Sequence, residues 1–214
     1  MKRRDFSLQL AAAGLGTVWA TSAGAQVGPV EGTHYTKLAQ PVPVSVPAGK
    51  IEVIEFFSYG CPHCFALEPT LEPWAKRLPD DVVFKRVPVG FNALYENYQK
   101  IYYALEAMGQ VENMHRKVFN AIHQQRLRLD KEADIAAFMT ANGIDGAKFV
   151  ELYKSFTVQT KAKQAQQLSQ AYKIEGVPTL AVQGRYTTSG SQAGSNERAL
   201  AVADALVQTA RKPG

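Results

Sequence analysis

The sequence predicts an α/β fold in which a βαβ half and a ββα half flank an all-helical inserted domain. Three observations carry this prediction: strand and helix patterns alternate over residues 51–89, helical periodicity continues from about residue 92 to 168, and strand signals return at Val177 before a last helix. The chain has 214 residues, of which 46% are hydrophobic and 20% charged. A chain of this length and composition buries a core without crosslinks, which excludes a disordered tail and a disulfide-dense miniprotein.

The first 25 residues predict a secretory signal peptide. Basic residues at positions 2–4 precede the apolar, alanine-rich stretch Leu8–Ala20, and Ala23–Ala25 has the small-x-small pattern of a cleavage site. The apolar stretch is shorter than the roughly 20 residues of a membrane span, which disfavours a retained anchor, and a cytosolic helix is the other alternative. The pair Arg3-Arg4 leaves the general and the twin-arginine export routes open. We therefore expect a soluble exported protein.

The charge distribution argues against a nucleic-acid partner. The net charge is +5, from 24 Lys and Arg against 19 Asp and Glu. A nucleic-acid-binding chain gathers such an excess on one element, whereas no basic block occurs here outside the extreme N-terminus.

The first half of the mature chain is expected to form the βαβ unit. The Pro- and Gly-rich residues 26–50 predict an extended segment with one edge strand near His34–Leu38. Ile51–Phe57 is β-branched and aromatic, which is typical of a buried central strand. The apolar pattern then predicts a helix over residues 62–78 and a second strand at Val82–Val89.

The rest of the chain predicts an all-helical insertion followed by the ββα unit. Five helical stripes occupy the insertion, and we interpret their aromatic residues as helix packing rather than as a ligand-binding cluster. Strands at Val177–Val182 and Arg185–Thr188 are expected to pair as a hairpin, and a last helix spans Ser195–Arg211 with Ser195 as its cap. After the signal peptide we expect three segments: residues 26–91 and 169–214 as the two parts of one domain, and residues 92–168 as the insertion.

The only two cysteines, Cys61 and Cys64, lie in one Cys-Pro-His-Cys motif that follows a predicted strand and opens a helix. This is the context of a redox-active dithiol site. A residue at a helix N-terminus faces unpaired N–H groups and the positive end of the helix dipole, so Cys61 is the expected exposed nucleophile. Cys64, one turn further, is the expected buried, resolving thiol. Pro62 sets the helical φ angle, and His63 adds a donor, and a positive charge when protonated, beside Cys61.

Two other uses of the cysteine pair are disfavoured. A zinc site needs two further ligands, and His34, His115 and His123 show no suitable spacing. A purely structural disulfide would close so short a loop that it constrains little of the unfolded chain. We expect no metal and no organic cofactor.

Three features can be compared with known families: the sequence FFSYGCPHC at Phe56–Cys64, the helical insertion between two halves, and the sequence GVPT at Gly176–Thr179. Together they resemble the bacterial DsbA family of thiol:disulfide interchange proteins, over essentially the whole mature chain. The resemblance implies a thioredoxin-like fold with the helical insertion, and a periplasmic enzyme that oxidises cysteine pairs.

The resemblance also implies roles for single residues. Cys61 and Cys64 would form the redox-active disulfide, with Cys61 as the attacked cysteine and His63 favouring its thiolate. Pro178 matches a cis-proline that faces the active site, and the backbone of the residue before it would pair with an extended substrate segment. The expected substrate-binding residues are Val177, Pro178 and Pro62.

Glu55 lies between Ile54 and Phe56 in the predicted central strand. It matches a buried acid next to the active-site pair of the family, which implies a proton carrier for Cys64. An ordinary strand Glu that faces water is the alternative. Within a buried apolar run a desolvated carboxyl is favoured.

The expected function is that of a periplasmic thiol:disulfide oxidoreductase that donates its disulfide to reduced exported proteins. The family implies a membrane quinone reductase, DsbB, for reoxidation, and we expect a monomer. Two alternatives remain, a disulfide isomerase or reductase and a non-enzymatic peptide-binding holdase. Exported isomerases of the known kind carry a separate dimerisation domain, for which the chain has no room, and a holdase would not need the cysteines.

Overall fold

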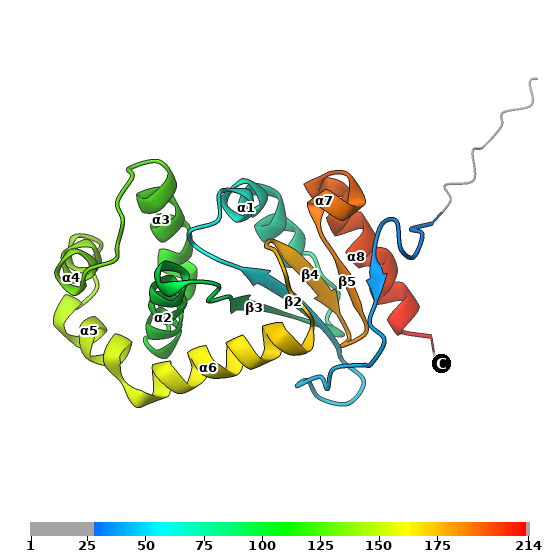
Figure 1. The fold of residues 1–214 in the computed structure, drawn as a ribbon, viewed down its shortest axis with the longest axis horizontal. Helices are drawn as coiled ribbons and strands as arrows, with labels where there is room; N and C mark the ends of the chain where they lie inside the picture. Colours follow the sequence, from blue (N-terminus) through cyan, green and yellow to red (C-terminus); the bar gives the residue numbers. More distant parts are fainter. Residues whose placement is uncertain (1–27, 213–214) are drawn as a thin grey trace, which may run out of the picture.

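The computed structural model describes residues 28–212, which form one five-stranded mixed sheet with helices on both faces (Figure 1). The strand order is β1-β5-β4-β2-β3. β2 pairs in parallel with β3 and antiparallel with β4, which pairs antiparallel with β5, so the βαβ half and the hairpin are confirmed. The predicted signal peptide lies outside the described residues. The strands are β1 Thr36–Lys37, β2 Ile51–Phe57, β3 Val82–Pro88, β4 Thr179–Val182 and β5 Tyr186–Thr188.

β2 is the central strand, and all seven of its residues are buried. On one face of the sheet, Val53 belongs to a core cluster with residues of α1 (Pro62–Ala75) and α8 (Asn196–Ala210). On the other face, the ring of Phe56 lies 5.2 Å from that of Tyr172, which follows the last helix of the insertion. The sheet therefore has a covered layer on each side, and the chain leaves β2 directly into the Cys-Pro-His-Cys turn.

The insertion consists of five helices, as predicted. The side chains of Asn92, Asp145 and Ser155 each accept a backbone N–H at the start of a helix, which stabilises each helix by about 1 kcal/mol. The last of the five runs along the sheet and returns the chain to β4 (Figure 1), and it ends at Ala171, three residues beyond the expected boundary of the insertion at residue 168. The helices are α2 Ala93–Ala107, α3 Val111–His123, α4 Glu132–Ala141, α5 Gly146–Lys154 and α6 Phe156–Ala171.

Two predicted boundaries move for an identifiable reason, and one helix was not predicted. α1 ends at Ala75, because the N–H groups of Arg77 and Leu78 bond to carbonyl groups three residues back rather than four. β4 begins at Thr179, since Pro178 has no N–H to donate to a strand ladder. The short helix α7 (Gly190–Ala193) was not predicted, because four residues carry no apolar period; it ends at Gly194 with a left-handed φ of 97°.

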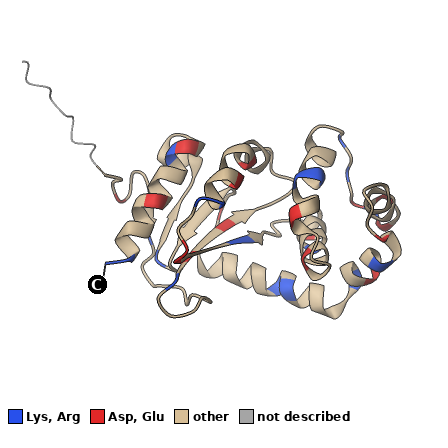
Figure 2. Ribbon diagram, turned by 180° about the vertical axis from the view of Figure 1, so that it is seen from behind, with Lys and Arg blue, Asp and Glu red and all other residues tan. Residues whose placement is uncertain are grey.

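Acidic and basic residues are interspersed along the helices of both halves rather than gathered on one element (Figure 2). Within residues 28–212, no helix has the length and apolar character to cross a membrane.

Candidate active site

Cys61 is the N-cap residue of α1, and Pro62 occupies its first turn, as predicted. Cys61 Sγ accepts the backbone N–H of Cys64 at 3.4 Å. On its other side the Cys61 thiol donates to the carbonyl oxygen of Val177 at 3.2 Å. Both cysteines are free thiols, so the chain is in its dithiol form. The nucleophile therefore lies between a helix N-terminus and the loop before β4.

The exposure of Cys61 corrects one prediction. Cys61 exposes only 5% of its surface and Cys64 none, so Cys61 is not the exposed residue that the motif suggested. The contact with the Val177 loop, which is distant in sequence, accounts for the difference. The predicted order of the two cysteines is nevertheless observed. Pro62 and His63, which lie between them, are exposed.

The two thiols have opposite pKa shifts. The hydrogen bond from the Cys64 thiol is the main cause that lowers the pKa of Cys61 from 9.0 to about 6. Partial burial opposes this shift, while the backbone N–H groups of Cys64 and His63 and the charge of His63 support it. Burial raises the pKa of Cys64 well above 9.0, and the hydrogen bond to Cys61 adds to the rise. In the dithiol form the thiolate therefore resides on Cys61.

A groove opens beside the nucleophile. The Val177–Pro178 peptide bond is cis, as the family resemblance implied. A cavity of about 580 Å³ is lined by His63, by the loop residues 172–179 and by residues 187–192 of β5 and α7. The predicted substrate-binding residues Val177 and Pro178 therefore line one groove with His63, within reach of Cys61.

Glu55 is fully buried, so the alternative of a water-facing strand residue is excluded. Its Oε2 accepts Arg86 Nε–H at 3.1 Å, and its Oε1 has no hydrogen-bond partner among the described residues. Burial raises the pKa of Glu55 to about 8, with a further contribution from Glu68, although Arg86 opposes both. Glu55 is therefore largely protonated at neutral pH.

Sequence reasoning missed the partners of Glu55. Arg86 is the direct neighbour of Glu55 in the parallel β2–β3 register, and its Nη2 lies 3.2 Å from Glu68 Oε2 on α1. His115 Nε2 lies 3.1 Å from Glu68 Oε1, and His115 Nδ1 lies 2.9 Å from the Tyr59 hydroxyl. For the first pair the available signal was a charged residue within each of two strands that were predicted to belong to one βαβ unit. The His115 contacts join residues 47 and 56 positions apart, which no local pattern indicates.

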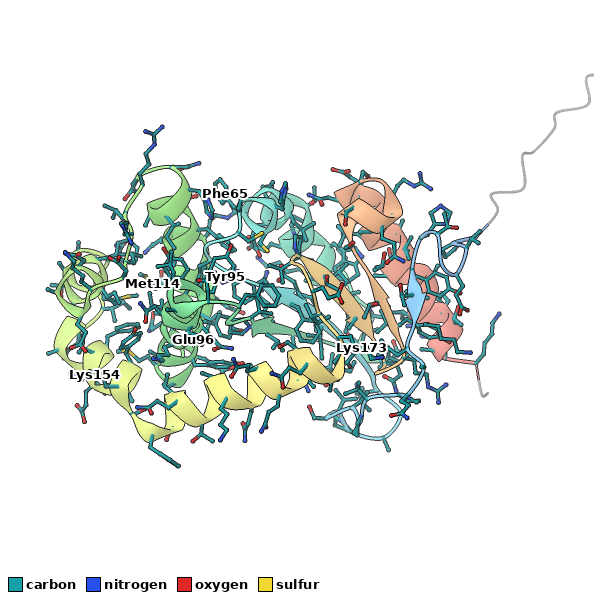
Figure 3. All side chains as sticks on the ribbon, viewed as in Figure 1. Phe65, Tyr95, Glu96, Met114, Lys154 and Lys173 are labelled. Carbon is teal, nitrogen blue, oxygen red and sulfur yellow. The ribbon has the colours of Figure 1, made fainter. Side chains whose placement is uncertain are left out.

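The insertion also holds the turn that precedes Cys61. His123 Nε2 of α3 donates to the Tyr59 carbonyl oxygen at 2.8 Å, and its ring stacks on Phe65 with centroids 5.0 Å apart. Phe65 belongs to α1, and its side chain lies on the side of α1 that faces α3 (Figure 3). A Cβ atom on Gly60 would lie 2.7 Å from the ring of Tyr95, so glycine permits the close approach of α2.

The remaining histidines do not join the cysteines in a metal site. No group of three or more His, Cys, Asp or Glu side chains within residues 28–212 is arranged to hold a metal ion. His34 lies in the N-terminal segment, where Nδ1 accepts the N–H of Val30, far in sequence from the redox pair.

A thioredoxin-type sheet with a low-pKa cysteine at the helix that follows its central strand defines a thiol:disulfide oxidoreductase. Residues 52–199 match the family of DSBA-like thioredoxin domains. The chain belongs to this family.

Relatives of known sequence and structure support the assignment. The thiol:disulfide interchange protein DsbA of Bordetella pertussis is 44% identical over 214 residues, which cover 99% of this chain and 100% of that protein. The DsbA of Pseudomonas aeruginosa is 42% identical over 180 residues, 84% of this chain and 85% of that protein. A crystal structure of Pseudomonas aeruginosa DsbA superimposes with a TM-score of 0.81, covering 84% of this chain and 93% of that one. The oxidoreductase DsbA from Xylella fastidiosa superimposes with a TM-score of 0.79 at 30% identity, covering 86% and 98%.

Proposed function

We propose that the chain oxidises pairs of cysteines in newly exported proteins by donating a Cys61–Cys64 disulfide. A substrate thiolate attacks Cys61 Sγ and forms an intermolecular disulfide, while the Cys61–Cys64 bond breaks and Cys64 leaves with the electron pair and takes a proton. A second substrate thiolate then attacks the substrate sulfur of the intermolecular disulfide, and Cys61 leaves as a thiolate. The substrate has lost two electrons and gained a disulfide, and the chain is left as the dithiol.

The opposite pKa shifts of the two thiols are the observation that carries this proposal. A pKa of about 6 makes Cys61 a good leaving group in the second step, because its thiolate needs no proton at neutral pH. The same stabilisation favours the reduced form of the chain over the disulfide form. A disulfide whose reduced form is stabilised is an oxidant towards substrate dithiols.

Glu55 is the proposed proton donor to Cys64. Cys64 leaves as a thiolate whose pKa lies well above 9.0, so it takes up a proton at neutral pH. Glu55 is largely protonated at that pH, and its Oε1 is not engaged by any described residue. When Glu55 ionises, its carboxylate raises the pKa of Cys64, so the two groups interact. These properties are those of a buried general acid.

The groove beside Cys61 is the proposed substrate site. An extended peptide can pair with the backbone of Val177 in the loop just before β4, since main-chain pairing binds without strong sequence preference. Pro178 and His63 line the same groove, and the exposed Pro62 lies between Cys61 and His63 in the chain. Substrates would accordingly be recognised as unfolded segments that carry a cysteine.

The proposal places the chain in the periplasm, as a monomer that a membrane quinone reductase of the DsbB type reoxidises. The signal-peptide pattern of residues 1–25 and the family membership support this placement. Residues 26–91 and 169–214 are proposed as one thioredoxin-like domain, with residues 92–168 as its insertion.

The test is stoichiometric oxidation without air. The oxidised chain is mixed with a reduced, unfolded protein that has two cysteines, and disulfides are counted after acid quenching and alkylation. We expect one substrate disulfide for each chain reduced, and none from the Cys61→Ser/Cys64→Ser double variant. A double variant that keeps its effect on the substrate would indicate a holdase, and activity that only the dithiol form shows on mispaired disulfides would indicate an isomerase.

A further inference from the structure

The buried end of the site holds two carboxylates and one guanidinium. Arg86 Nε lies 3.1 Å from Glu55 Oε2, and Arg86 Nη2 lies 3.2 Å from Glu68 Oε2. The side chain of Glu55 is unexposed and that of Glu68 is 5% exposed. Two buried carboxylates beside one cation cannot both ionise without an uncompensated charge, so one of them holds a proton.

The other groups near this cluster do not give Glu55 or Glu68 a second cation, because Lys76 and Arg116, which line the same cavity as Glu68, both pair with Glu72. Burial raises the pKa values of Tyr59 and of Tyr102 on α2, so both hydroxyls are neutral. Cys61 and Glu72 on α1 contribute negative charge. Burial lowers the pKa of His115 on α3, although Glu68 opposes this, so the imidazole is neutral at neutral pH. The question is therefore which of the two acids carries the proton.

His115 makes the two carboxylates unequal. The Tyr59 hydroxyl lies 2.9 Å from His115 Nδ1, and we assign the Nε2–H tautomer of the neutral imidazole, in which this hydroxyl donates a hydrogen bond to Nδ1. The neutral imidazole then carries its own proton on Nε2, which lies 3.1 Å from Glu68 Oε1 and donates to it. Glu68 consequently receives hydrogen bonds from both a guanidinium and an imidazole. Glu55 receives one hydrogen bond, and its Oε1 receives none from the described residues.

We infer that His115 is a positioning residue that assigns the single buried proton to Glu55 by keeping Glu68 ionised. The hydrogen bond from Nε2 favours the charged form of Glu68, which then holds Arg86 and leaves the proton to the second acid. A proton on Glu68 would lie on a carboxyl whose two oxygens already face Arg86 and His115. The inference rests on the proposed role of Glu55 as proton donor to Cys64. It gives the inserted helix α3 control over the protonation of an acid on β2.

The test replaces His115 and follows the protonation of Glu55 directly. Glutamate carboxyl carbons are labelled with ¹³C in the oxidised chain and titrated by NMR, and the Glu55 signal is assigned by its loss in Glu55→Gln. His115→Phe keeps an aromatic ring beside Phe57 and Phe119 but removes the donor. We expect the pKa of Glu68 to rise, because it loses a hydrogen-bond donor. The pKa of Glu55 should fall by about one unit or more, because the Arg86 guanidinium then stabilises the Glu55 carboxylate alone.

Two variants control for a merely structural effect. His115→Gln keeps an N–H donor near the place of Nε2 and should restore most of the Glu55 titration. His123→Phe removes a histidine from the same helix that also bonds Tyr59 but does not bond Glu68, and it should leave Glu55 unchanged. An unchanged Glu55 titration in His115→Phe overturns the inference.

A second variant keeps the test decisive if His115→Phe does not fold. Glu68→Gln removes the competing carboxylate, so the pKa of Glu55 should fall in this variant as well, and an unchanged value overturns the inference. The titration shows which of the two acids carries the proton, and it does not depend on the rate of thiol exchange. If Glu55→Gln exchanges thiols at the wild-type rate, the donor role fails while the assignment of the proton stands. If the pKa of Glu55 is unchanged in both variants while Glu55→Gln exchanges thiols slowly, the assignment of the proton fails and the donor role stands.

Discussion

The relative stability of the reduced and oxidised chains should depend on pH through Cys61. A thiol whose pKa is lowered on folding adds stability above its unfolded pKa, and this stability is lost as the pH falls through the folded pKa. For Cys61 that window runs from 9.0 down to about 6. The oxidised chain has no thiolate, so its stability lacks this dependence. The raised pKa of Cys64 lowers the stability of the reduced chain only above about pH 9, outside the range considered.

The magnitude follows from the two pKa values of Cys61. The thiolate adds almost nothing at pH 5, about 1.4 kcal/mol at pH 7 and about 2.7 kcal/mol at pH 8, from a limit of about 4 kcal/mol. Against this, the disulfide stabilises the oxidised chain by about 2 kcal/mol through chain entropy, because it closes a loop of only four residues. The reduced chain should therefore be the less stable form at pH 5 and the more stable form above about pH 7.5.

Urea unfolding of both redox forms at pH 5, 6, 7 and 8, without oxygen, measures this gap. The Cys61→Ser/Cys64→Ser variant, unfolded in parallel, reports the pH dependence of all other groups. We expect the free energy of unfolding of the reduced chain, minus that of the oxidised chain, to rise by about 2.5 kcal/mol from pH 5 to pH 8. A gap that is constant over this range, or that moves in favour of the oxidised chain, would refute the assignment of a low pKa to Cys61.

Five further predictions follow from the same groups. At pH 6, iodoacetamide should alkylate Cys61 more than tenfold faster than Cys64, whose pKa is raised; equal rates by mass spectrometry would contradict the roles. His63→Ala should slow alkylation of Cys61 about two- to threefold below pH 6, because the charge of His63 is a minor cause of the shift. Glu55→Gln should slow formation of the intermolecular disulfide about tenfold or more in stopped-flow experiments. It should also raise the free energy of unfolding at pH 7 by about 3 kcal/mol, since the stability from the raised pKa of Glu55 is present below 4.5 and is largely lost by pH 7; an unchanged denaturation midpoint would contradict this. Arg86→Met should cost about 3 to 5 kcal/mol of stability at pH 8, because it leaves buried acids without a cation, and a loss below 1 kcal/mol would contradict the pairing.

Local patterns were enough to predict most of the sheet and the nucleophile. A β-branched run predicts β2, and Pro62 after a turn predicts the start of α1, because both signals act within a few residues. The N-cap position of Cys61 follows from that placement, whereas its low pKa depends mainly on the hydrogen bond from the Cys64 thiol one turn further along the helix. The cover over Cys61 was not predicted, because it comes from Val177, 116 residues away.

The buried charges could be predicted only in part. Glu55 was recognised from its place in an apolar run, but its partners lie on three other elements and are brought together by tertiary packing. Arg86 could have been found from the pairing of two strands in register, since it lies directly opposite Glu55. His115 could not have been found, because its stripe on α3 predicts ordinary helix packing.

The pH dependence of the reduction midpoint potential tests the central claim, a thiolate on Cys61 in the reduced chain, most directly. Reduction consumes two protons for two electrons below the pKa of Cys61 and one proton above it, so the potential should fall by about 59 mV per pH unit below pH 6 and by about 30 mV above it. The potential is measured against glutathione from pH 4 to 8.5. The Glu55→Gln variant is measured in parallel, because the pKa of Glu55 also depends on the charge of Cys61 and its titration could add a second pH dependence. A break in slope near pH 6 in both proteins is the result that we predict. A slope of about 59 mV that continues to pH 8.5 would contradict it.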